Sequence, residues 1–498
     1  MPFTVRRFSA IVPLLVAVSA CSPDATPTLA PQLVTRPSAT VAKRFSYLVA
    51  SRTSRDLPSS LDAEVQAAGG TVVATIPQIG LAIVESDRED FADAVQLSGV
   101  ESIVPDVPMA TVDGSDNSSF TVGSPLSTEA TTFAGAPPIP VGGDELSGLQ
   151  WGLQAIHAPE AWALGYTGRG VRVAVLDAGI QSNHVDLAPN LNTSLSTSFV
   201  PGQTYNSPPG SHGTQVAGLI AAAHNNVGVV GVAPNAEIVA IKILFANGTG
   251  AIARVAQGLV YAADVGAKIA NLSVGINLPR ATEIVLDTKG TEDPTDDGRV
   301  KISNRQVIDL LRSLGRATNY AHSKGVLIIA ASGNISKDFD HAKSDIGIPQ
   351  ELPHVITVGP TGPLGWALDP TTDLDVNPSY SNYGQSYIDL AAPGGNFDVF
   401  TRPGLPPSCT LLTFTWPCQV FDIVLTTQLG NSWGWNFGGS FAAPHAAGVA
   451  ALIYEKLGDA ATPERVEMIL RNSADDIGKP GNDDFFGQGR VNALRAVK

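Results

Sequence analysis

The chain of 498 residues has few cysteines, few aromatic side chains and no excess of basic charge. Its 46 acidic and 31 basic side chains give a formal charge of −15, and this excludes a general nucleic-acid binder, which needs basic groups to neutralise phosphates. No apolar run reaches the roughly 18 residues that a membrane-spanning helix requires. Glycine and proline show no collagen-like repeat. The apolar share of 44% instead predicts a large core, divided between two or three domains.

Residues 1–21 are predicted to be an export signal. The basic pair Arg6-Arg7 precedes an apolar stretch that is too short to span a bilayer. The segment Val18-Ser19-Ala20-Cys21 resembles a bacterial lipoprotein cleavage site, which implies acylation of Cys21. Ordinary secretion with cleavage near Ala20 is the alternative. We expect an exported protein, secreted or lipid-anchored at the cell envelope, that touches the membrane only through Cys21.

The rest of the chain changes composition several times. Residues 22–43 are rich in Pro, Thr, Ser and Ala and predict a flexible tether. Residues 44–110 follow the order strand, helix, strand, strand, helix, strand, which predicts a small ferredoxin-like α+β domain. Residues 111–148 read as a second linker. Residues 149–498 alternate buried strands with amphipathic helices, which predicts an α/β fold: a mostly parallel sheet with helices on both faces.

Two segments interrupt that alternation, near 277–305 and near 395–432, and both are predicted to be surface loops. The second contains Cys409 and Cys418, an even pair if Cys21 carries lipid. A disulfide formed in an oxidising compartment is one interpretation of this pair, and two buried free thiols are the other. Neither cysteine has a His or Cys at metal-ligand spacing, so zinc is not predicted.

Three chemically active residues lie where strands end or helices begin. Asp177 directly follows a buried strand, His212 starts a helix, and Ser440 precedes an Ala-rich helix. The carboxyl ends of parallel strands are where α/β sheets form their active sites. A serine nucleophile needs a base to take its proton and an anion to orient that base. Each residue by itself is also typical of a cap or turn, but together, in this order, they predict nucleophilic catalysis by Ser440.

From about Gln150 to the C-terminus the chain resembles the subtilisin-like serine peptidases. Besides the three residues above, the resemblance rests on the blocks Gly231-Val232-Ala233-Pro234, Asn271-Leu272-Ser273-Val274-Gly275, Ala330-Ala331-Ser332-Gly333-Asn334, Tyr380-Ser381-Asn382-Tyr383-Gly384 and Gly487-Gln488-Gly489-Arg490-Val491-Asn492-Ala493. It implies a serine endopeptidase that requires no cofactor for its chemistry. Ser440 would be the nucleophile, His212 the general acid–base, Asp177 the anion that orients His212, and Asn334 the donor to the oxyanion.

Two positions depart from the family. Ala178 stands where a hydroxyl residue is usual, and Gly439 stands where threonine is usual. Neither change removes a group that handles protons, so we expect an active enzyme. Three further histidines have no catalytic match: His445 is interpreted as a packed helix residue, and His184 and His224 as surface or loop residues.

The resemblance also implies how a polypeptide substrate binds. Two extended stretches would hold its backbone by strand addition, and a pocket between them would take the side chain before the scissile bond. The implied substrate-binding residues are Gly248, Gly250, Ser273, Val274, Gly275, Ala331, Ser332, Gly333 and Gly347. The small residues predict an open apolar slot for Phe, Tyr, Leu or Met. Asp345 is a competing signal that would favour Lys or Arg.

Residues 44–110 resemble the inhibitory propeptide of these peptidases, which implies a precursor that processes itself; an adhesion or spacer domain is the alternative. Asp186 and Asn226 lie where the family often builds a calcium site and are weak candidates, so structural calcium stays open. We expect a monomer whose partners are polypeptide substrates and its own propeptide.

Two other functions remain as rivals. One is a catalytically weak, surface-anchored binding module on the same fold. The other is an esterase-type hydrolase, whose serine would precede the Asp and His in the chain, whereas Ser440 comes last.

Overall fold

The computed structural model describes residues 44–111, 120–122, 143–279, 282–286, 298–341, 344–398 and 408–498. The predictions on the export signal, the tether and Cys21 lie outside these residues. Within them, no helix is long and apolar enough to cross a membrane.

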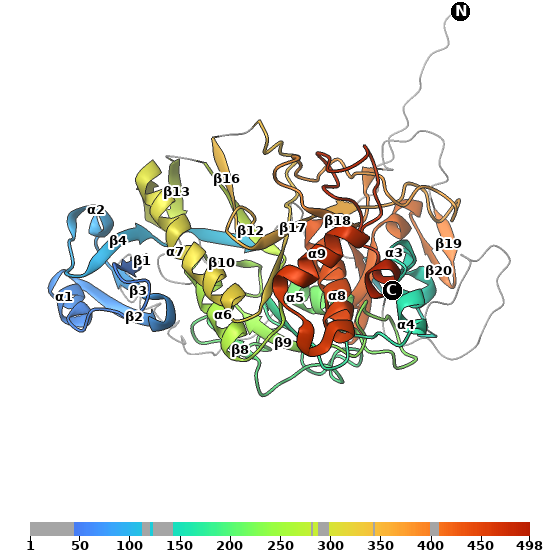
Figure 1. Ribbon diagram of the computed structural model, residues 1–498, viewed down its shortest axis with the longest axis horizontal. Coiled ribbons are helices and arrows are strands. Elements are labelled where there is room, and N and C mark those ends of the chain that lie inside the picture. Colours follow the sequence, from blue (N-terminus) through green and yellow to red (C-terminus); the bar gives the residue numbers. More distant parts are fainter. Residues whose placement is uncertain are drawn as a thin grey trace, which may run out of the picture. The chain divides into compact units, whose positions relative to one another are not determined.

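A seven-stranded parallel sheet forms the centre of the C-terminal region, as predicted (Figure 1). Its strands, in spatial order, are β18 (Leu390–Pro393), β17 (Val355–Thr361), β15 (Leu327–Ala331), β11 (Ile269–Leu272), β7 (Arg172–Asp177), β9 (Glu237–Lys242) and β8 (Thr197–Ser198). Their short runs of Val, Ile, Leu and Ala are buried on both faces, which is what a parallel sheet covered by helices requires.

Helices cover both faces of this sheet. Alternate strand residues belong to two hydrophobic clusters: Leu176 packs with α6 (Ala253–Asp264) and α7 (Asn304–Ser323), and Val175 packs with α5 (Ser211–Ala221) and α8 (Gly439–Leu457). The shorter helices are α3 (Trp151–Ala155), α4 (Ala158–Ala163), α9 (Pro463–Ser473) and α10 (Ala493–Val497). The order of elements is that of an α/β fold wound on both sides of the sheet.

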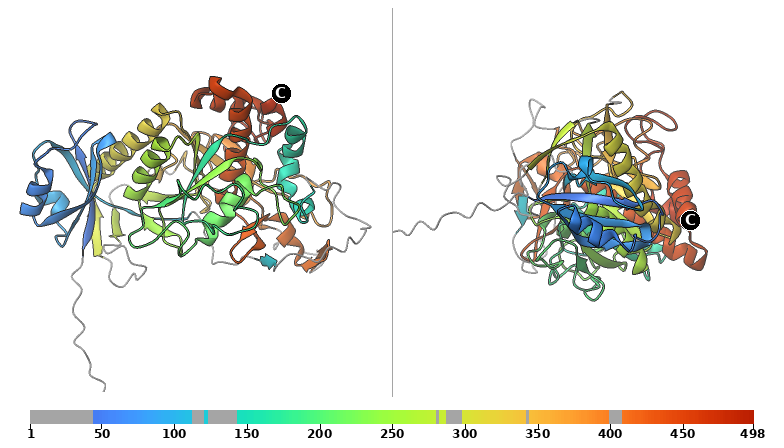
Figure 2. Two further views of the ribbon diagram at one scale, coloured as in Figure 1. Left: turned by 90° about the horizontal axis from the view of Figure 1, so that it is seen from below. Right: turned by 90° about the vertical axis from the view of Figure 1, so that its left-hand side faces the viewer.

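A small antiparallel sheet with order β2-β3-β1-β4 precedes this fold, as the ferredoxin-like pattern predicts. Its elements are β1 (Phe45–Ser51), α1 (Leu61–Ala67), β2 (Gly70–Ile76), β3 (Leu81–Ser86), α2 (Phe91–Ala94) and β4 (Val100–Pro105). The core of this domain, which includes Tyr47, Leu48 and Phe91, is continuous with the cluster around α6 and α7. Figures 1 and 2 show the domain in blue beside α7.

A four-residue strand continues from the small domain into the larger one. β5 (Pro108–Thr111) lies between β10 (Thr249–Ala251) and β12 (Val274–Pro279), antiparallel to both, and β16 (Asp345–Ile348) completes this sheet. The chain thus supplies one of its own segments to the space between the two stretches that were predicted to hold a substrate backbone.

The two segments predicted as surface loops are more ordered than expected. The first contains a hairpin of β13 (Thr282–Leu286) and β14 (Gly298–Ile302). The second contains the hairpin of β19 (Cys409–Leu411) and β20 (Phe414–Trp416) and then β21 (Val424–Gln428). At its end begins β22 (Ser432–Asn436), which pairs with β21 and with β6 (Phe120–Val122). Cys409 and Cys418 form a disulfide. Because the segment has the composition of a loop, the sequence did not predict that Val420 and Phe421 are buried. Both belong to a third hydrophobic cluster.

Candidate active site

Asp177 and His212 form a hydrogen-bonded pair at the carboxyl edge of the central sheet. Asp177 is the last residue of β7, and His212 is the second residue of α5. His212 Nδ1 lies 2.8 Å from Asp177 Oδ2 and 3.0 Å from Oδ1. The backbone N–H of Ala178 donates to Asp177 Oδ1 at 2.6 Å. Both side chains are buried, so the carboxylate fixes the orientation of the imidazole in a site of low polarity.

A buried lysine, which sequence patterns did not predict, contacts both the loop after Asp177 and the loop before His212. The Lys242 ammonium, at the end of β9, donates to the carbonyl oxygens of Ala178 and Pro208, the latter at 3.1 Å. These two carbonyls belong to the loop after Asp177 and to the loop before His212. The only sequence signal for this contact was the position of Lys242 at the end of a strand that pairs with the strand of Asp177.

Ser440 lies at the N-terminus of the 19-residue helix α8, where the backbone dipoles favour negative charge. Its Oγ donates to the carbonyl oxygen of Ser273 at 3.3 Å, and Ser273 Oγ donates to the carbonyl of Ser440 at 2.7 Å. The ring of Phe441, the next residue, contacts the ring of His212 edge to face, with centroids 5.9 Å apart. The structure therefore brings Ser440, His212 and Asp177 to one edge of the sheet.

Asn334 lies beside the residues that precede Ser440. Its Oδ1 accepts a hydrogen bond from the N–H of Gly439 at 2.8 Å. Gly438 has φ 135°, and a Cβ at that position would lie 2.6 Å from Asn334 Nδ2. A glycine is therefore needed at 438 for the amide to approach the helix N-terminus. A side-chain N–H and the amides of a helix N-terminus are the donors that an oxyanion requires.

The stretches predicted to bind a substrate lie on either side of β5. In the register of β5, Met109 is opposite Gly250, Ala110 is opposite Gly275, and Thr111 is opposite Val274. The N–H of Thr111 also donates to the Gly248 carbonyl at 2.8 Å. The arrangement shows that a four-residue extended peptide fits between these stretches as a third strand.

Of the predicted pocket walls, Ala331 is the last residue of β15 and Ser332 and Gly333 follow it, and the predicted floor Gly347 lies on β16, paired with β12. Two side chains that sequence reasoning missed, Gln350 and Tyr387, contact these predicted pocket residues. Gln350 donates to the Ala331 carbonyl and Tyr387 donates to the Ser332 carbonyl. The proximity of Gln350 to Gly347 in the sequence was the only available signal.

The three histidines without a catalytic match differ in their burial. His445 is buried, its Nδ1–H donates to the Phe441 carbonyl at 2.7 Å, and burial lowers its pKa to about 4. This agrees with the interpretation of a packed helix residue. His184 lies in a loop, as one of the two expectations had it, but it is buried and therefore not a surface residue, and burial lowers its pKa. His224 is half exposed, 3.8 Å from Asp144.

The candidate calcium residues do not fit a cation. Asp186 Oδ2 accepts hydrogen bonds from the Trp433 indole at 2.6 Å and from the Val229 N–H at 3.2 Å. The N–H of Asn226 points at the Asp144 carboxylate, at 2.6 Å. Donor N–H groups thus line the loop where calcium would need oxygen ligands. No group of three or more His, Cys, Asp or Glu side chains suited to a metal occurs among the residues that the structure describes.

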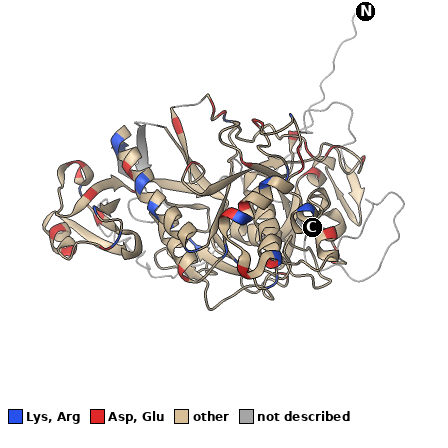
Figure 3. Cartoon of the chain, viewed as in Figure 1, with Lys and Arg blue, Asp and Glu red and all other residues tan. Residues whose placement is uncertain are grey.

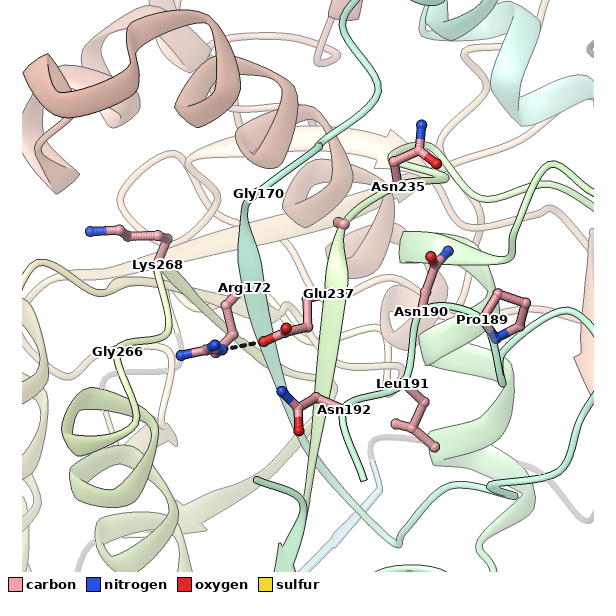
Figure 4. A pocket seen from close by; sticks show the side chains of 11 residues that line it. Gly170, Arg172, Pro189, Asn190, Leu191, Asn192, Asn235, Glu237, Gly266 and Lys268 are labelled. Carbon is pink, nitrogen blue, oxygen red and sulfur yellow. Dashed lines mark hydrogen bonds and ion pairs between the residues drawn. The ribbon is translucent and has the colours of Figure 1, made fainter. Parts of the chain in front are cut away.

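A separate hollow of about 440 Å³ opens at the opposite edge of the central sheet (Figure 4). Arg172 and Glu237, which begin β7 and β9, form an ion pair across it, and Lys268 precedes β11 on its rim. Because Asp177 lies at the other end of β7, this hollow is separate from the candidate active site.

Comparison with known proteins agrees with this geometry. The profile described as the subtilase family matches residues 168–489, a segment that contains Asp177, His212, Asn334 and Ser440. The chain belongs to the subtilase family. It is therefore a serine peptidase that hydrolyses peptide bonds in polypeptide substrates.

The related subtilases cover most of the chain. Subtilisin BL of Lederbergia lenta is 34% identical over 351 residues, which are 70% of this chain and 99% of that protein. Thermitase of Thermoactinomyces vulgaris is 31% identical over 353 residues, 71% of this chain and 97% of that protein.

Two solved structures share the fold. The epidermin leader peptide processing serine protease of Staphylococcus aureus has a TM-score of 0.68 and 21% identity, covering 91% of this chain and 98% of that one. Fervidolysin, a keratinolytic enzyme of Fervidobacterium pennivorans, has a TM-score of 0.64 and 24% identity, covering 92% of this chain. The chain spans 61% of the length of fervidolysin.

Proposed function

We propose that this subtilase is an exported endopeptidase that uses Ser440 as nucleophile, His212 as general acid–base and Asp177 to orient His212. The observation that carries the proposal is the contact of His212 Nδ1 with Asp177 at 2.8 Å, on the same sheet edge as Ser440. In the reaction, His212 takes the hydroxyl proton as Ser440 attacks the carbonyl carbon and returns it to the leaving amine. Asn334 Nδ2 and the N–H of Ser440 stabilise the oxyanion.

The proposal extends to residues 44–110 as an inhibitory propeptide, which the chain follows with Thr111. Met109, with 3% of its surface exposed, and Thr111 lie where a substrate backbone would bind, which blocks the cleft to other peptides. Asp106 supports this position, because its Oδ1 accepts from the N–H of Ala253 at 2.9 Å, at the N-terminus of α6. We place the cut that matures the precursor within the few residues that follow Thr111.

Side-chain contacts with α7 support the same role. Gln306 donates to Asp93 at 3.0 Å, and Arg316 donates to Glu101 at 2.6 Å and to the Ser51 carbonyl at 2.9 Å. Figure 3 shows the basic positions along α7 in blue. Such polar contacts, together with a shared apolar cluster, are what an inhibitor that leaves after cleavage requires.

A fluorophosphonate probe, which reacts with activated serines, tests the proposed chemistry together with casein hydrolysis. The mature protein should be labelled on Ser440 and should hydrolyse casein, and Ser440→Ala should lose both properties. As a matched control, Ser323→Ala, at the exposed end of α7, should retain both. A folded mature protein that neither reacts with the probe nor cleaves casein would support the binding-module rival instead.

We propose further that Cys21 is acylated and anchors a monomeric enzyme through the tether of residues 22–43. Several acyl chains give stable attachment where one gives only marginal binding. Cys21→Ala should move the protein from the membrane to the soluble fraction with unchanged kcat/KM. Wild-type protein found wholly in the soluble fraction, with an unmodified N-terminus, would exclude the anchor.

A further inference from the structure

The pocket for the side chain before the scissile bond is bounded by glycines and closed by two longer side chains. Gly275 on β12 forms one wall, the carbonyls of Ala331 and Ser332 form the other, and Gly347 on β16 forms the floor. Glycines at such positions usually leave room for a large ligand group. In this chain the room is taken by Gln350 and Tyr387.

Gln350 spans the space between the two walls. Its Nε2 donates to the Ala331 carbonyl at 2.5 Å, and a Cβ at Gly275 would lie 3.0 Å from that Nε2 and 3.3 Å from Oε1. The side chain is 7% exposed. The carboxamide therefore lies against both predicted walls and occupies space between them.

Tyr387 lies against the predicted floor of the pocket at Gly347. Its Oη donates to the Ser332 carbonyl at 2.9 Å and lies 2.7 Å from the place of a Cβ on Gly347. The ring stacks on Phe339, with centroids 3.8 Å apart and planes within 2°. This stacking and the 5% exposure of the residue hold the hydroxyl in place.

The negative charge of Asp345, which would favour a basic substrate side chain, is neutralised by an ion pair. Asp345 forms an ion pair with Lys337, whose ammonium also lies 5.7 Å from the centre of the Phe339 ring. A substrate Lys or Arg would have to displace Lys337 before it met the Asp345 carboxylate. The pocket therefore offers little to a basic side chain.

We infer that Gln350 and Tyr387 shorten this pocket, so that the enzyme prefers small residues such as Ala, Ser, Thr or Val before the cut and discriminates against Phe, Tyr, Leu and Met. The inference rests on the proposed function and assigns the specificity of that site. The chain's own peptide agrees with it in sequence, because β5 ends in Ala110-Thr111 and Val112 follows. A pocket that lacks space for a few methylene groups discriminates by about 10- to 200-fold.

The test uses the mature enzyme with succinyl-Ala-Ala-Pro-X-p-nitroanilides in which X is Ala, Val, Phe or Arg. Wild type should show at least about tenfold higher kcat/KM for Ala or Val than for Phe or Arg. Gln350→Gly should raise the ratio of Phe to Ala about tenfold or more, and Tyr387→Phe, which removes only the hydroxyl, should raise it less. Gln385→Ala, an exposed glutamine, is the matched control and should leave the ratio unchanged.

Active-site titration with the fluorophosphonate separates the two possible failures. An enzyme that takes up no probe contradicts the proposed function. An enzyme that is labelled but favours Phe over Ala as wild type overturns the inference, whether or not the variants fold. A wild-type preference for Ala that Gln350→Gly leaves unchanged, in a folded and titrated variant, also overturns it.

Discussion

At the scale of single residues, the two positions that depart from the family pattern, Ala178 and Gly439, each donate a backbone hydrogen bond within the candidate active site. The N–H of Ala178 donates to Asp177, and the N–H of Gly439 donates to Asn334 Oδ1. Both bonds use groups that any residue except proline supplies, so the loss of a hydroxyl at 178 and of a side chain at 439 leaves these contacts in place. A Cβ at Gly439 would lie 3.2 Å from Ser332 Oγ, a tight contact that glycine avoids.

The contact between Gly439 and Asn334 leads to a prediction on catalysis. Since Oδ1 of Asn334 accepts the N–H of Gly439, Nδ2 is the side-chain donor that the proposed mechanism directs to the oxyanion. Asn334→Ala should lower kcat about 100- to 1000-fold with a much smaller change in KM, as expected for a group that acts in the transition state. Steady-state kinetics on a chromogenic peptide measure the effect. Asn482→Ala, on the exposed surface, should leave both constants unchanged, and an equal loss in both variants would argue against an oxyanion role.

His445 leads to a prediction on acid stability. Burial lowers its pKa to about 4, against about 6.5 in an unfolded chain. The neutral imidazole therefore contributes stability that is fully present above about pH 6.5 and is lost as the pH falls toward 4. The difference in pKa corresponds to about 3 kcal/mol.

Urea unfolding of proteins that carry Ser440→Ala, which prevents self-digestion, measures this loss at pH 7 and pH 4. Replacing His445→Asn should reduce the fall in unfolding free energy between the two pH values by about 3 kcal/mol. Because every other titrating group is shared by the two proteins, their contributions cancel in the comparison. An identical fall in both proteins would show that His445 does not titrate in this range.

At the scale of elements, the hydrophobic periodicity predicted most of the strands and helices. β7 ends at Asp177, directly after the predicted buried strand, and α5 begins beside His212, where a helix start was predicted, because those patterns are local. The segment 395–432 was predicted less well. Its buried residues Val420 and Phe421 stand between the polar residues Gln419 and Asp422, and they belong to one cluster with Trp151 and Trp435, which lie elsewhere in the sequence. Local patterns do not contain such contacts.

The disulfide of this segment leads to a prediction on stability. Cys409 and Cys418 close a short loop whose ends belong to the third hydrophobic cluster. Replacing both by serine should lower the unfolding free energy by about 2–3 kcal/mol, since the open loop gains conformational freedom when unfolded. Differential scanning calorimetry in the Ser440→Ala background measures the change in Tm. Cys21→Ala leaves this pair intact and should not alter Tm; a double variant as stable as its parent would contradict the prediction.

At the scale of the whole molecule, the sequence predicted the small antiparallel domain and the large α/β domain, but not how they join. The motifs placed Gly248 and Gly275 on the walls of a cleft, and β5 was assigned to the end of a domain and to a linker. β5 has only four residues and pairs with β10 and β12, which are distant in the sequence, so no local pattern predicts this strand. The same reason applies to Gln350 and Tyr387, whose positions depend on contacts across the fold.

The central claim is that Ser440 cuts the chain's own precursor just after β5. The most direct measurement is the intact mass and N-terminal sequence of purified precursor, incubated for wild type, Ser440→Ala and the control Ser323→Ala. Wild type and the control should yield a species that begins within a few residues after Thr111, whereas Ser440→Ala should stay full-length. If purified Ser440→Ala matured at the same place and rate as wild type, Ser440 would not be the nucleophile of that cut and the claim would fail.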